Sequence, residues 1–347
     1  MTQTETVPAD LASAAAEALT AYDLPGPATV RPLRLLNNSV FDVCAGDGRR
    51  FALRLHRPGA RRPEHTLAEL TFLHKVSGPL AAQRVDVPAP VPAADGRLVV
   101  TVASPDATEP LTCTLLTWVD GKVRRPGGGL GARGVHQLGR ALAHLHLAAE
   151  SFDPPPGFTL PRWDAEAMFT ERSPYDPGPI GELLTGADLA LFEEVAERTA
   201  RIFAELGTGP ETYGLIHNDF ILGNCHTVRR RPHSWNVGVV DFDNCGWGHY
   251  LYDFAAVLGN LSDYAHFAEL RNAFLAGYRI ARPLRESLEQ HFPVLMAARH
   301  ASHCLWAAGL ARHPSSEAFD APWHIGYRMS EVRRCLTLGR DFETSVR

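Results

Sequence analysis

The stretch that decides the fold reads His217-Asn218-Asp219-Phe220-Ile221-Leu222-Gly223-Asn224, and Val239-Val240-Asp241-Phe242-Asp243 follows it. An Asp lies five residues before an Asn, and a second Asp ends an apolar run. Metal-assisted phosphoryl transfer from ATP uses three such groups: a carboxylate that orients and deprotonates a hydroxyl, and two oxygen ligands that hold Mg²⁺ on the phosphates. The pattern predicts a kinase in which Asp219 is the catalytic base and Asn224 and Asp241 bind the metal.

The surroundings favour the same interpretation. Leu215-Ile216 and the apolar run 237–240 predict short strands, each ending just before an acidic residue. Between them, Thr227 to Asn236 is a basic segment with three consecutive arginines and a proline, which predicts the turn of a hairpin. The alternative is that these carboxylates are ordinary turn residues and helix caps. Three such groups at this spacing favour the catalytic interpretation.

The chain resembles the aminoglycoside phosphotransferase and choline kinase-like group of small-molecule kinases. The resemblance rests on the H-x-D-x-x-x-x-N pattern from His217, on Asp241, and on Tyr252-Asp253-Phe254-Ala255. It implies that His217 backs the catalytic loop, which we define as residues 217–224, and that Asp253 braces this loop from below. Where protein kinases have Asp-Phe-Gly, this chain has Asp-Phe-Asp. That departure argues against a mobile activation segment.

The resemblance also implies an α+β, bilobal, protein kinase-like fold. We expect a small β-rich N-terminal lobe over residues 1–118, which covers the nucleotide, and a larger helical C-terminal lobe over residues 119–347. The ATP site would lie between the lobes, and ATP and Mg²⁺ would be the cofactors.

The first third of the sequence fits the β-rich lobe. A helix is predicted from Asp10, followed by strands over Val30–Leu36, Val40–Ala45 and Phe51–Leu55. The turn Asn37-Asn38-Ser39 stands where a phosphate-covering loop is expected, which makes Ser39 a candidate nucleotide contact. It lacks the glycines of the protein-kinase version, and a plain hairpin turn would have the same sequence.

A cation that holds the α- and β-phosphates is expected on the third strand, with a helix carboxylate to orient it. Arg54 is the candidate cation, and Glu69, on a helix predicted from Pro63 to Gly78, is its candidate partner. An exposed strand charge and a solvated helix face are the alternatives. His56 or Arg57 would replace Arg54 if the strand register differs, because a one-residue slip reverses the face.

The strand predicted over Leu111–Trp118 leads into the expected hinge between the lobes. By resemblance, the backbone around Leu116 and Trp118 would hydrogen-bond the adenine edge. These contacts would depend little on side-chain identity.

The remainder of the sequence predicts helices, including one over Gly134–Glu150 that carries His144 and His146. Two histidines at this spacing face different sides of a helix, so we expect packing or surface roles for them. Further on, Arg299, His303 and Trp306 share a helix face at helical spacing. This face would grip an anionic substrate. A partly buried helix surface is the alternative.

Composition excludes several classes of protein. The chain has 347 residues, 45% of them hydrophobic, a formal charge of −5 and a pI near 6.3. These values argue against a disordered protein and against a general binder of nucleic acid or membrane surfaces. Six scattered cysteines without a C-x-x-C pair indicate neither a disulfide framework nor a zinc ribbon. We expect a cytoplasmic protein, and the sequence leaves its oligomeric state open.

The acceptor is the least determined part of the prediction. An acidic segment from Asp164 to Glu182 would suit a polycationic aminoglycoside, but residues 290–316 contain no acid and several Arg and His. An amino alcohol or a hydroxy amino acid is therefore favoured. An aminoglycoside, a protein hydroxyl as in a stress-response Ser/Thr kinase, and a non-catalytic nucleotide-binding pseudokinase remain the alternatives.

Overall fold

The computed structural model describes residues 9–35, 38–56, 58–59, 61–103, 110–231, 234–312 and 319–345. The chain forms two compact units. The first contains Met1–Gly121, Phe152–Leu160 and Gly238–Asp243, and the second contains Lys122–Ser151, Pro161–Val237 and Asn244–Arg347. Two short segments far along the sequence therefore belong to the first unit. The division into domains at residue 118 stays a prediction.

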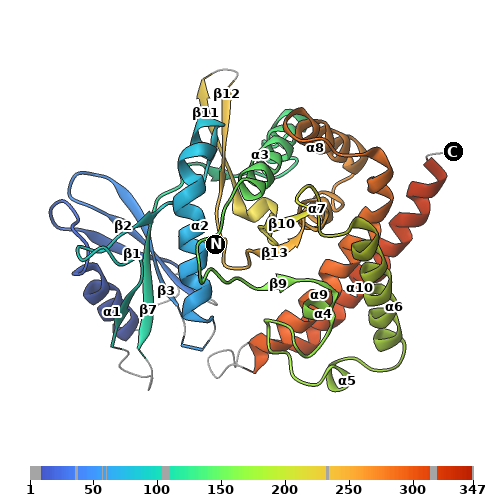
Figure 1. Ribbon diagram of the computed structural model, residues 1–347, viewed down its shortest axis with the longest axis horizontal. Coiled ribbons are helices and arrows are strands. Elements are labelled where there is room, and N and C mark those ends of the chain that lie inside the picture. The colour runs from blue at the N-terminus through green and yellow to red at the C-terminus, as the bar shows by residue number, and fades with distance from the viewer. Residues whose placement is uncertain are drawn as a thin grey trace. The chain divides into compact units, whose positions relative to one another are not determined.

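The first unit is built on an antiparallel sheet in the order β1-β2-β3-β7-β5, with β6 also paired to β7. Its elements are α1 (Ala9–Leu19), β1 (Thr29–Leu35), β2 (Asn38–Cys44), β3 (Arg50–His56), α2 (Pro63–Ala82), β4 (Val85–Asp86), β5 (Pro90–Val91), β6 (Val100–Val102) and β7 (Leu111–Thr117). Figure 1 shows α1 and α2 on opposite sides of this sheet. The three predicted strands and both helices are present, with ends shifted by a few residues.

Strand β3 shows how the two faces of this sheet differ. Successive side chains of a strand point to opposite faces. Phe51, Leu53 and Leu55 are buried in the core with alanines of α1. Arg54 therefore points to the other face, on which α2 lies, and it is buried there.

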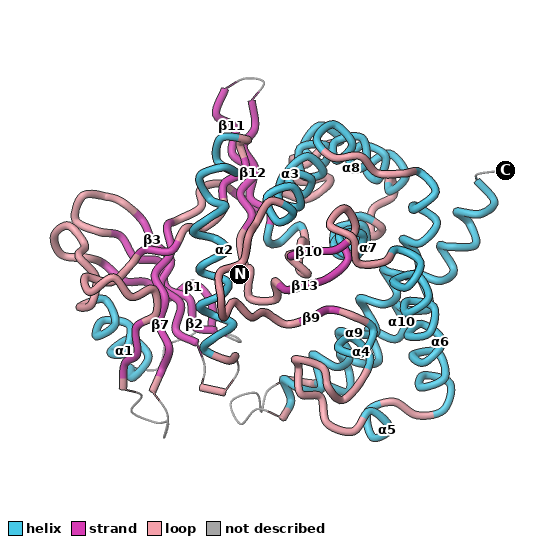
Figure 2. Tube along the Cα trace, in the orientation of Figure 1, coloured by secondary structure: helices cyan, strands magenta, loops and turns pink. Residues whose placement is uncertain are grey.

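The second unit is mainly helical, as the tube in Figure 2 shows. Its helices are α3 (Ala132–Glu150), α4 (Ala165–Phe169), α5 (Ile180–Leu183), α6 (Gly186–Leu206), α7 (Tyr250–Leu261), α8 (Phe267–Ala281), α9 (Phe292–Ala311) and α10 (Ala321–Ser345), with short 3₁₀ helices η1 (Leu222–Asn224) and η2 (Glu286–His291). Helix α9 is buried on nearly all sides and packs against α6, α7 and α10. Most of its residues are apolar, which is typical of a helix in a core, and Arg299 is a buried exception.

The strands of the second unit correct one prediction. The run Leu215-Ile216 lies in β10 (Tyr213–Ile216), which pairs with β13 (Gly246–His249), and β13 pairs in parallel with β9 (Arg162–Trp163). The segment predicted as a turn is mostly strand, because β11 spans Cys225–Arg231 and β12 spans Ser234–Val239. Strand β11 also pairs with β8 (Lys122–Val123). Only residues 232–233, which lie outside the described residues, remain between β11 and β12. The prediction of a turn was wrong because three consecutive arginines and a proline have turn-like composition although the arginines end a strand.

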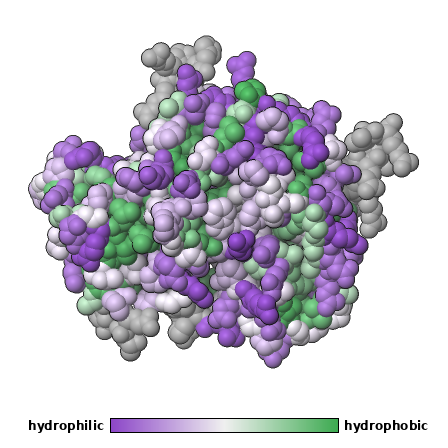
Figure 3. Space-filling model, in the orientation of Figure 1, coloured by the Kyte–Doolittle hydropathy of each residue, from purple (hydrophilic) through white to green (hydrophobic). Residues whose placement is uncertain are grey.

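Hydrophilic residues cover much of the face drawn in Figure 3, with smaller hydrophobic areas between them. Across the described ranges, every helix is too short or too polar to cross a bilayer.

Two glycines let α3 and α8 approach closely. A Cβ built at Gly139 would lie 2.0 Å from the carbonyl oxygen of Phe274, and one at Gly277 would lie 1.9 Å from that of His136. Both contacts are with backbone, which cannot move aside as a flexible side chain would. The sequence therefore needs glycine at both positions of this helix crossing.

We predict that Gly277→Ala lowers the free energy of unfolding by about 2–3 kcal/mol, because the added methyl overpacks a backbone contact. The matched control is Gly326→Ala in α10, where an added Cβ meets nothing within 4 Å. That change should stabilise the protein by about 0.5–1 kcal/mol through helix propensity. Urea unfolding of both variants tests this, and equal midpoints for the two would contradict the close-packing account.

Candidate active site

In the first unit, Arg54 and Glu69 form a buried ion pair. Arg54 Nη2 donates to Glu69 Oε1 at 2.9 Å, and Arg61 donates to the other oxygen of the same carboxylate. The alternation of β3 directs Arg54 toward α2, and Glu69 is fully buried on that helix. The alternatives, that Arg54 is an exposed strand charge and that Glu69 lies on a solvated helix face, are therefore wrong.

Asp243 completes this cluster, and sequence reasoning gave it no role. Arg54 Nη1 donates to Asp243 Oδ1 at 2.6 Å, and Arg61 and the Asn38 amide also donate to this carboxylate. Burial lowers the pKa of Arg54, but the Glu69 and Asp243 carboxylates outweigh it and hold that pKa above its ordinary value. The second acid of Asp241-Phe242-Asp243 thus binds the strand cation.

His56 and Arg57 were the alternatives to Arg54 as the phosphate-binding cation. His56 is buried, with its Nε2 3.3 Å from Thr114 Oγ1. Burial, followed by the nearby Arg54, lowers the pKa of His56 to about 3, so its ring is neutral near pH 7 and is no phosphate-holding cation. Arg57 lies outside the described residues.

The other predicted nucleotide contacts lie on the same sheet. Ser39 is on β2 opposite Leu55, and Leu116 is on β7 between Ala52 and Pro90. Trp118 directly follows β7, and its N–H donates to the Arg50 carbonyl at 3.2 Å. The Arg50 guanidinium covers the Trp118 ring at 3.7 Å. Trp118 is therefore held in place at the end of the strand.

Asp241 follows β12 and has a φ of +67°. This left-handed backbone is rare for a residue with a side chain and is concentrated at functional sites. Asp241 belongs to the first unit, whereas the catalytic loop belongs to the second.

In the second unit, Asp219 is held by two neighbours. Arg299 Nη2 donates to Asp219 Oδ1, and Asn224 Nδ2 donates to Asp219 Oδ2 at 2.8 Å. Arg299 Nη1 also donates to the Asn218 carbonyl at 2.6 Å. The amide nitrogen of Asn224 faces Asp219, which leaves its oxygen as a hard ligand of the kind that Mg²⁺ takes. Arg299, predicted as a substrate contact, thus contacts the predicted base itself.

The catalytic loop rests on Asp253. Its carboxylate accepts the His217 N–H at 2.8 Å and the Asn218 N–H at 2.6 Å. Asn218, which precedes Asp219, has a φ of +61°. Like Asp241, it therefore has a left-handed backbone. Both N–H groups are buried, so they need these acceptors. Asp253 therefore holds two consecutive backbone N–H groups of the loop, and its role as a brace stays a prediction.

His146 extends this support in addition to the packing role that we expected for it. Its Nε2 lies 3.1 Å from Asp253 Oδ2 and its Nδ1 lies 2.9 Å from the Tyr278 hydroxyl. The side chain is fully buried, and burial lowers its pKa despite the neighbouring carboxylate. Helix spacing predicted that His144 and His146 face different sides of the helix. It could not predict that the buried one, His146, contacts Asp253.

A cluster of cationic and aromatic side chains lies on α9 and α10 beside Arg299. Arg328 donates to His324 Nε2 at 3.0 Å and lies 3.3 Å from His300 Nδ1. Among the described residues no carboxylate pairs with Arg328. Burial, followed by the nearby Arg299, lowers the pKa of Arg328. The remaining members are His303 and Trp306, whose rings lie 6.0 Å apart, and Trp306 also packs against His324.

The histidines of this cluster are neutral near pH 7. Burial, followed by Arg328 and Arg299, lowers the pKa of His300 to about 3. Burial and the same two arginines hold the pKa of His303 well below its ordinary value. Among the described residues, the charged groups around these histidines therefore include Arg299, which pairs with the Asp219 carboxylate, Arg328 and Arg334. Arg328 had no sequence signal, because it lies on a different helix from the predicted face.

No group of three or more His, Cys, Asp and Glu side chains suited to a metal ion occurs within the described part of the chain. A metal held by one carboxylate and one amide, as predicted for Mg²⁺, needs no such group.

Comparison with known proteins gives a consistent result. Residues 29–291 match the model of the phosphotransferase enzyme family. A protein of Deinococcus radiodurans is 32% identical over 306 residues, covering 85% of this chain and 80% of that protein. A homoserine kinase of Azorhizobium caulinodans is 30% identical over 234 residues, covering 66% of this chain and 65% of the kinase.

Among solved structures, a microcompartment-associated aminopropanol kinase has a TM-score of 0.74 and 30% identity, and the match covers 94% of this chain and 98% of that one. The predicted α+β, kinase-like fold is therefore confirmed.

Proposed function

The chain belongs to the phosphotransferase enzyme family, and from this premise we propose that it transfers the γ-phosphoryl group of ATP to the hydroxyl of a small hydroxy amino acid. The observation that carries the proposal is the environment of Asp219. This carboxylate is oriented by Arg299 and Asn224 on a loop whose backbone is held by Asp253.

Asp219 would act on the acceptor. Each carboxylate oxygen accepts one hydrogen bond from the protein and has a second lone pair. One of these would accept the proton of the attacking hydroxyl while the bond from the γ-phosphorus to its bridging oxygen breaks and ADP leaves. Arg299 holds this carboxylate in place through its bonds to Asp219 Oδ1 and to the Asn218 carbonyl.

The nucleotide would be held mainly by the first unit. Ser39 and the backbone around Leu116 and Trp118 are the proposed contacts, with Arg54, oriented by Glu69, as the cation near the phosphates. Asn224 and Asp241 would hold Mg²⁺ through oxygen atoms. The metal, when bound, supplies positive charge that stabilises the phosphates during transfer. The free amide oxygen of Asn224 fits this donor set.

The charges near Asp219 favour an acceptor with a carboxylate. Arg328 is half-buried and lacks a carboxylate partner among the described residues, and Arg299 lies close enough to lower its pKa. An anionic group on the acceptor would relieve this repulsion, whereas a polycationic aminoglycoside would be repelled. The predicted contacts His303 and Trp306 lie in the same cluster. We propose that Arg328 binds the acceptor carboxylate and that Arg299 chiefly orients Asp219.

The general reaction is tested with Asp219→Asn, which keeps the shape of the side chain but removes its basicity. We expect kcat to fall at least about 10²-fold, in line with general-base contributions, while ATP affinity changes little. ATP consumption with homoserine as acceptor and ATP binding by calorimetry give the two values. Full turnover in this variant would refute the role of Asp219.

The acceptor class is tested with a matched pair of compounds, since 3-aminopropan-1-ol is homoserine without its carboxylate. We expect Arg328→Gln to raise KM for homoserine by about one to two orders of magnitude, because a charged hydrogen-bonding partner is lost. KM for aminopropanol should stay constant. The control is Arg333→Gln, on the same helix but paired with Asp188 at the surface.

An equal rise for both acceptors would show that Arg328 supports the fold rather than the carboxylate. A wild type that prefers aminopropanol would contradict the hydroxy amino acid, while leaving the phosphotransferase reaction intact.

A further inference from the structure

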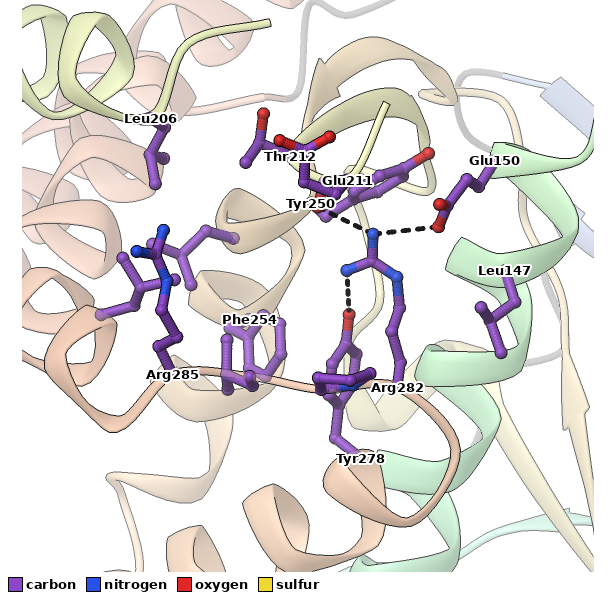
Figure 4. A pocket seen from close by; sticks show the side chains of 14 residues that line it. Leu147, Glu150, Leu206, Glu211, Thr212, Tyr250, Phe254, Tyr278, Arg282 and Arg285 are labelled. Atoms are coloured by element: carbon purple, nitrogen blue, oxygen red, sulfur yellow. Dashed lines mark hydrogen bonds and ion pairs between the residues drawn. The ribbon is translucent and has the colours of Figure 1, made fainter. Parts of the chain in front are cut away.

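A pocket of about 340 Å³ lies in the second unit, and none of its lining residues belongs to the catalytic loop (Figure 4). This volume is within the range of small-molecule sites. Half of its fourteen lining residues are Leu, Phe or Pro: Leu147, Leu206, Leu251, Phe254, Pro283, Leu284 and Leu288. None of these residues has a role in the proposed reaction.

Two charged side chains at this pocket are without partners. Arg285 and Glu211 both line it and both are exposed. Among the described residues, neither side chain forms an ion pair or a hydrogen bond. The Arg285 cation would suit the carboxylate of a zwitterion, and the Glu211 carboxylate would suit its ammonium. The apolar cavity would take an apolar side chain of the same molecule.

A third charged residue of the lining, Arg282, is buried and fully engaged on its outer nitrogens. Its Nη2 donates to the Glu211 carbonyl at 2.8 Å and to Glu150 Oε2 at 3.2 Å, and its Nη1 donates to the Tyr278 hydroxyl at 3.2 Å. Its guanidinium also lies 4.5 Å from the centre of the Tyr250 ring. Figure 4 shows Arg282 and Arg285 on opposite sides of Phe254.

Arg282 begins a hydrogen-bonded chain that ends at the catalytic loop. Tyr278 contacts His146 Nδ1, and His146 Nε2 contacts Asp253, which accepts the His217 and Asn218 amides. Every side chain in this path is buried. Contiguous hydrogen-bond networks of this kind carry energetic coupling between two distant sites.

We propose that this pocket is an effector site for an α-amino acid with an apolar side chain. The carboxylate binds Arg285, the ammonium binds Glu211, and the apolar side chain enters the cavity over Phe254. Glu211 also supplies the carbonyl that holds Arg282, and Arg285 lies three residues after Arg282. A ligand held by both residues therefore acts on the position of Arg282 and, through Tyr278 and His146, on Asp253.

The binding part of this inference is independent of the proposed reaction, whereas its effect on turnover rests on that function. The experiment therefore measures binding and loop protection directly. The probes are leucine, its deaminated acid 4-methylpentanoate and its decarboxylated amine isopentylamine, which share one apolar body. Calorimetry on the full chain should show leucine binding at least about tenfold more tightly than either single-charge analogue, which corresponds to about 1.4 kcal/mol.

Arg285→Ala and Glu211→Gln should each weaken leucine binding by about tenfold. The matched control is Arg201→Ala, an exposed arginine of α6 outside the pocket lining. Leucine should also change the hydrogen exchange of a peptide spanning residues 215–225 in the wild type, but not in Arg285→Ala. Equal binding of the three probes, absence of binding at millimolar concentration, or unchanged exchange on saturation with leucine would overturn the proposal.

Discussion

The proposed active site depends on the hydrogen bonds that the Asp253 carboxylate accepts from the catalytic loop. This carboxylate is fully buried and accepts two consecutive backbone N–H groups of the catalytic loop together with a contact from His146. Asn218 could not hold its left-handed backbone at this depth without an acceptor for its amide. Asp219 is the next residue, so this bond fixes the backbone from which its carboxylate reaches Arg299 and Asn224.

The charges of each unit are arranged around buried or partly buried acids. In the first unit Arg54 and Arg61 meet Glu69 and Asp243, and in the second Arg299 meets Asp219. A buried charge is tolerated when it is paired and hydrogen-bonded. Removing one partner leaves the other charge buried without compensation, which strongly destabilises the fold. The exception is Arg328, whose neighbours are histidines held neutral by burial. That imbalance beside Asp219 is the basis for proposing an acceptor carboxylate.

The sequence predicted the parts of this arrangement that are local or periodic. The catalytic-loop pattern, the alternation that turns Arg54 toward α2 and the first three strands of the first unit needed only spacing. The missed elements are tertiary. His146 and Asp253 are 107 residues apart, and Arg54 and Asp243 are 189 apart, so no spacing rule connects them. The turn predicted over Thr227 to Asn236 was wrong because three consecutive charged residues lack the alternation that predicts a strand, while β11 includes them.

The most direct test of this account is the hydrogen exchange of the His217 and Asn218 amides in Asp253→Asn. The replacement carries no charge and offers one acceptor oxygen, so it can keep at most one of the two amide bonds. Exposed Asp188→Asn on α6 is the control. We expect the catalytic loop to exchange at least about tenfold faster, the equivalent of about 1.4 kcal/mol of lost local stability, while α10 keeps its protection. Unchanged protection of the loop, combined with lost turnover, would show that Asp253 does not act by holding it.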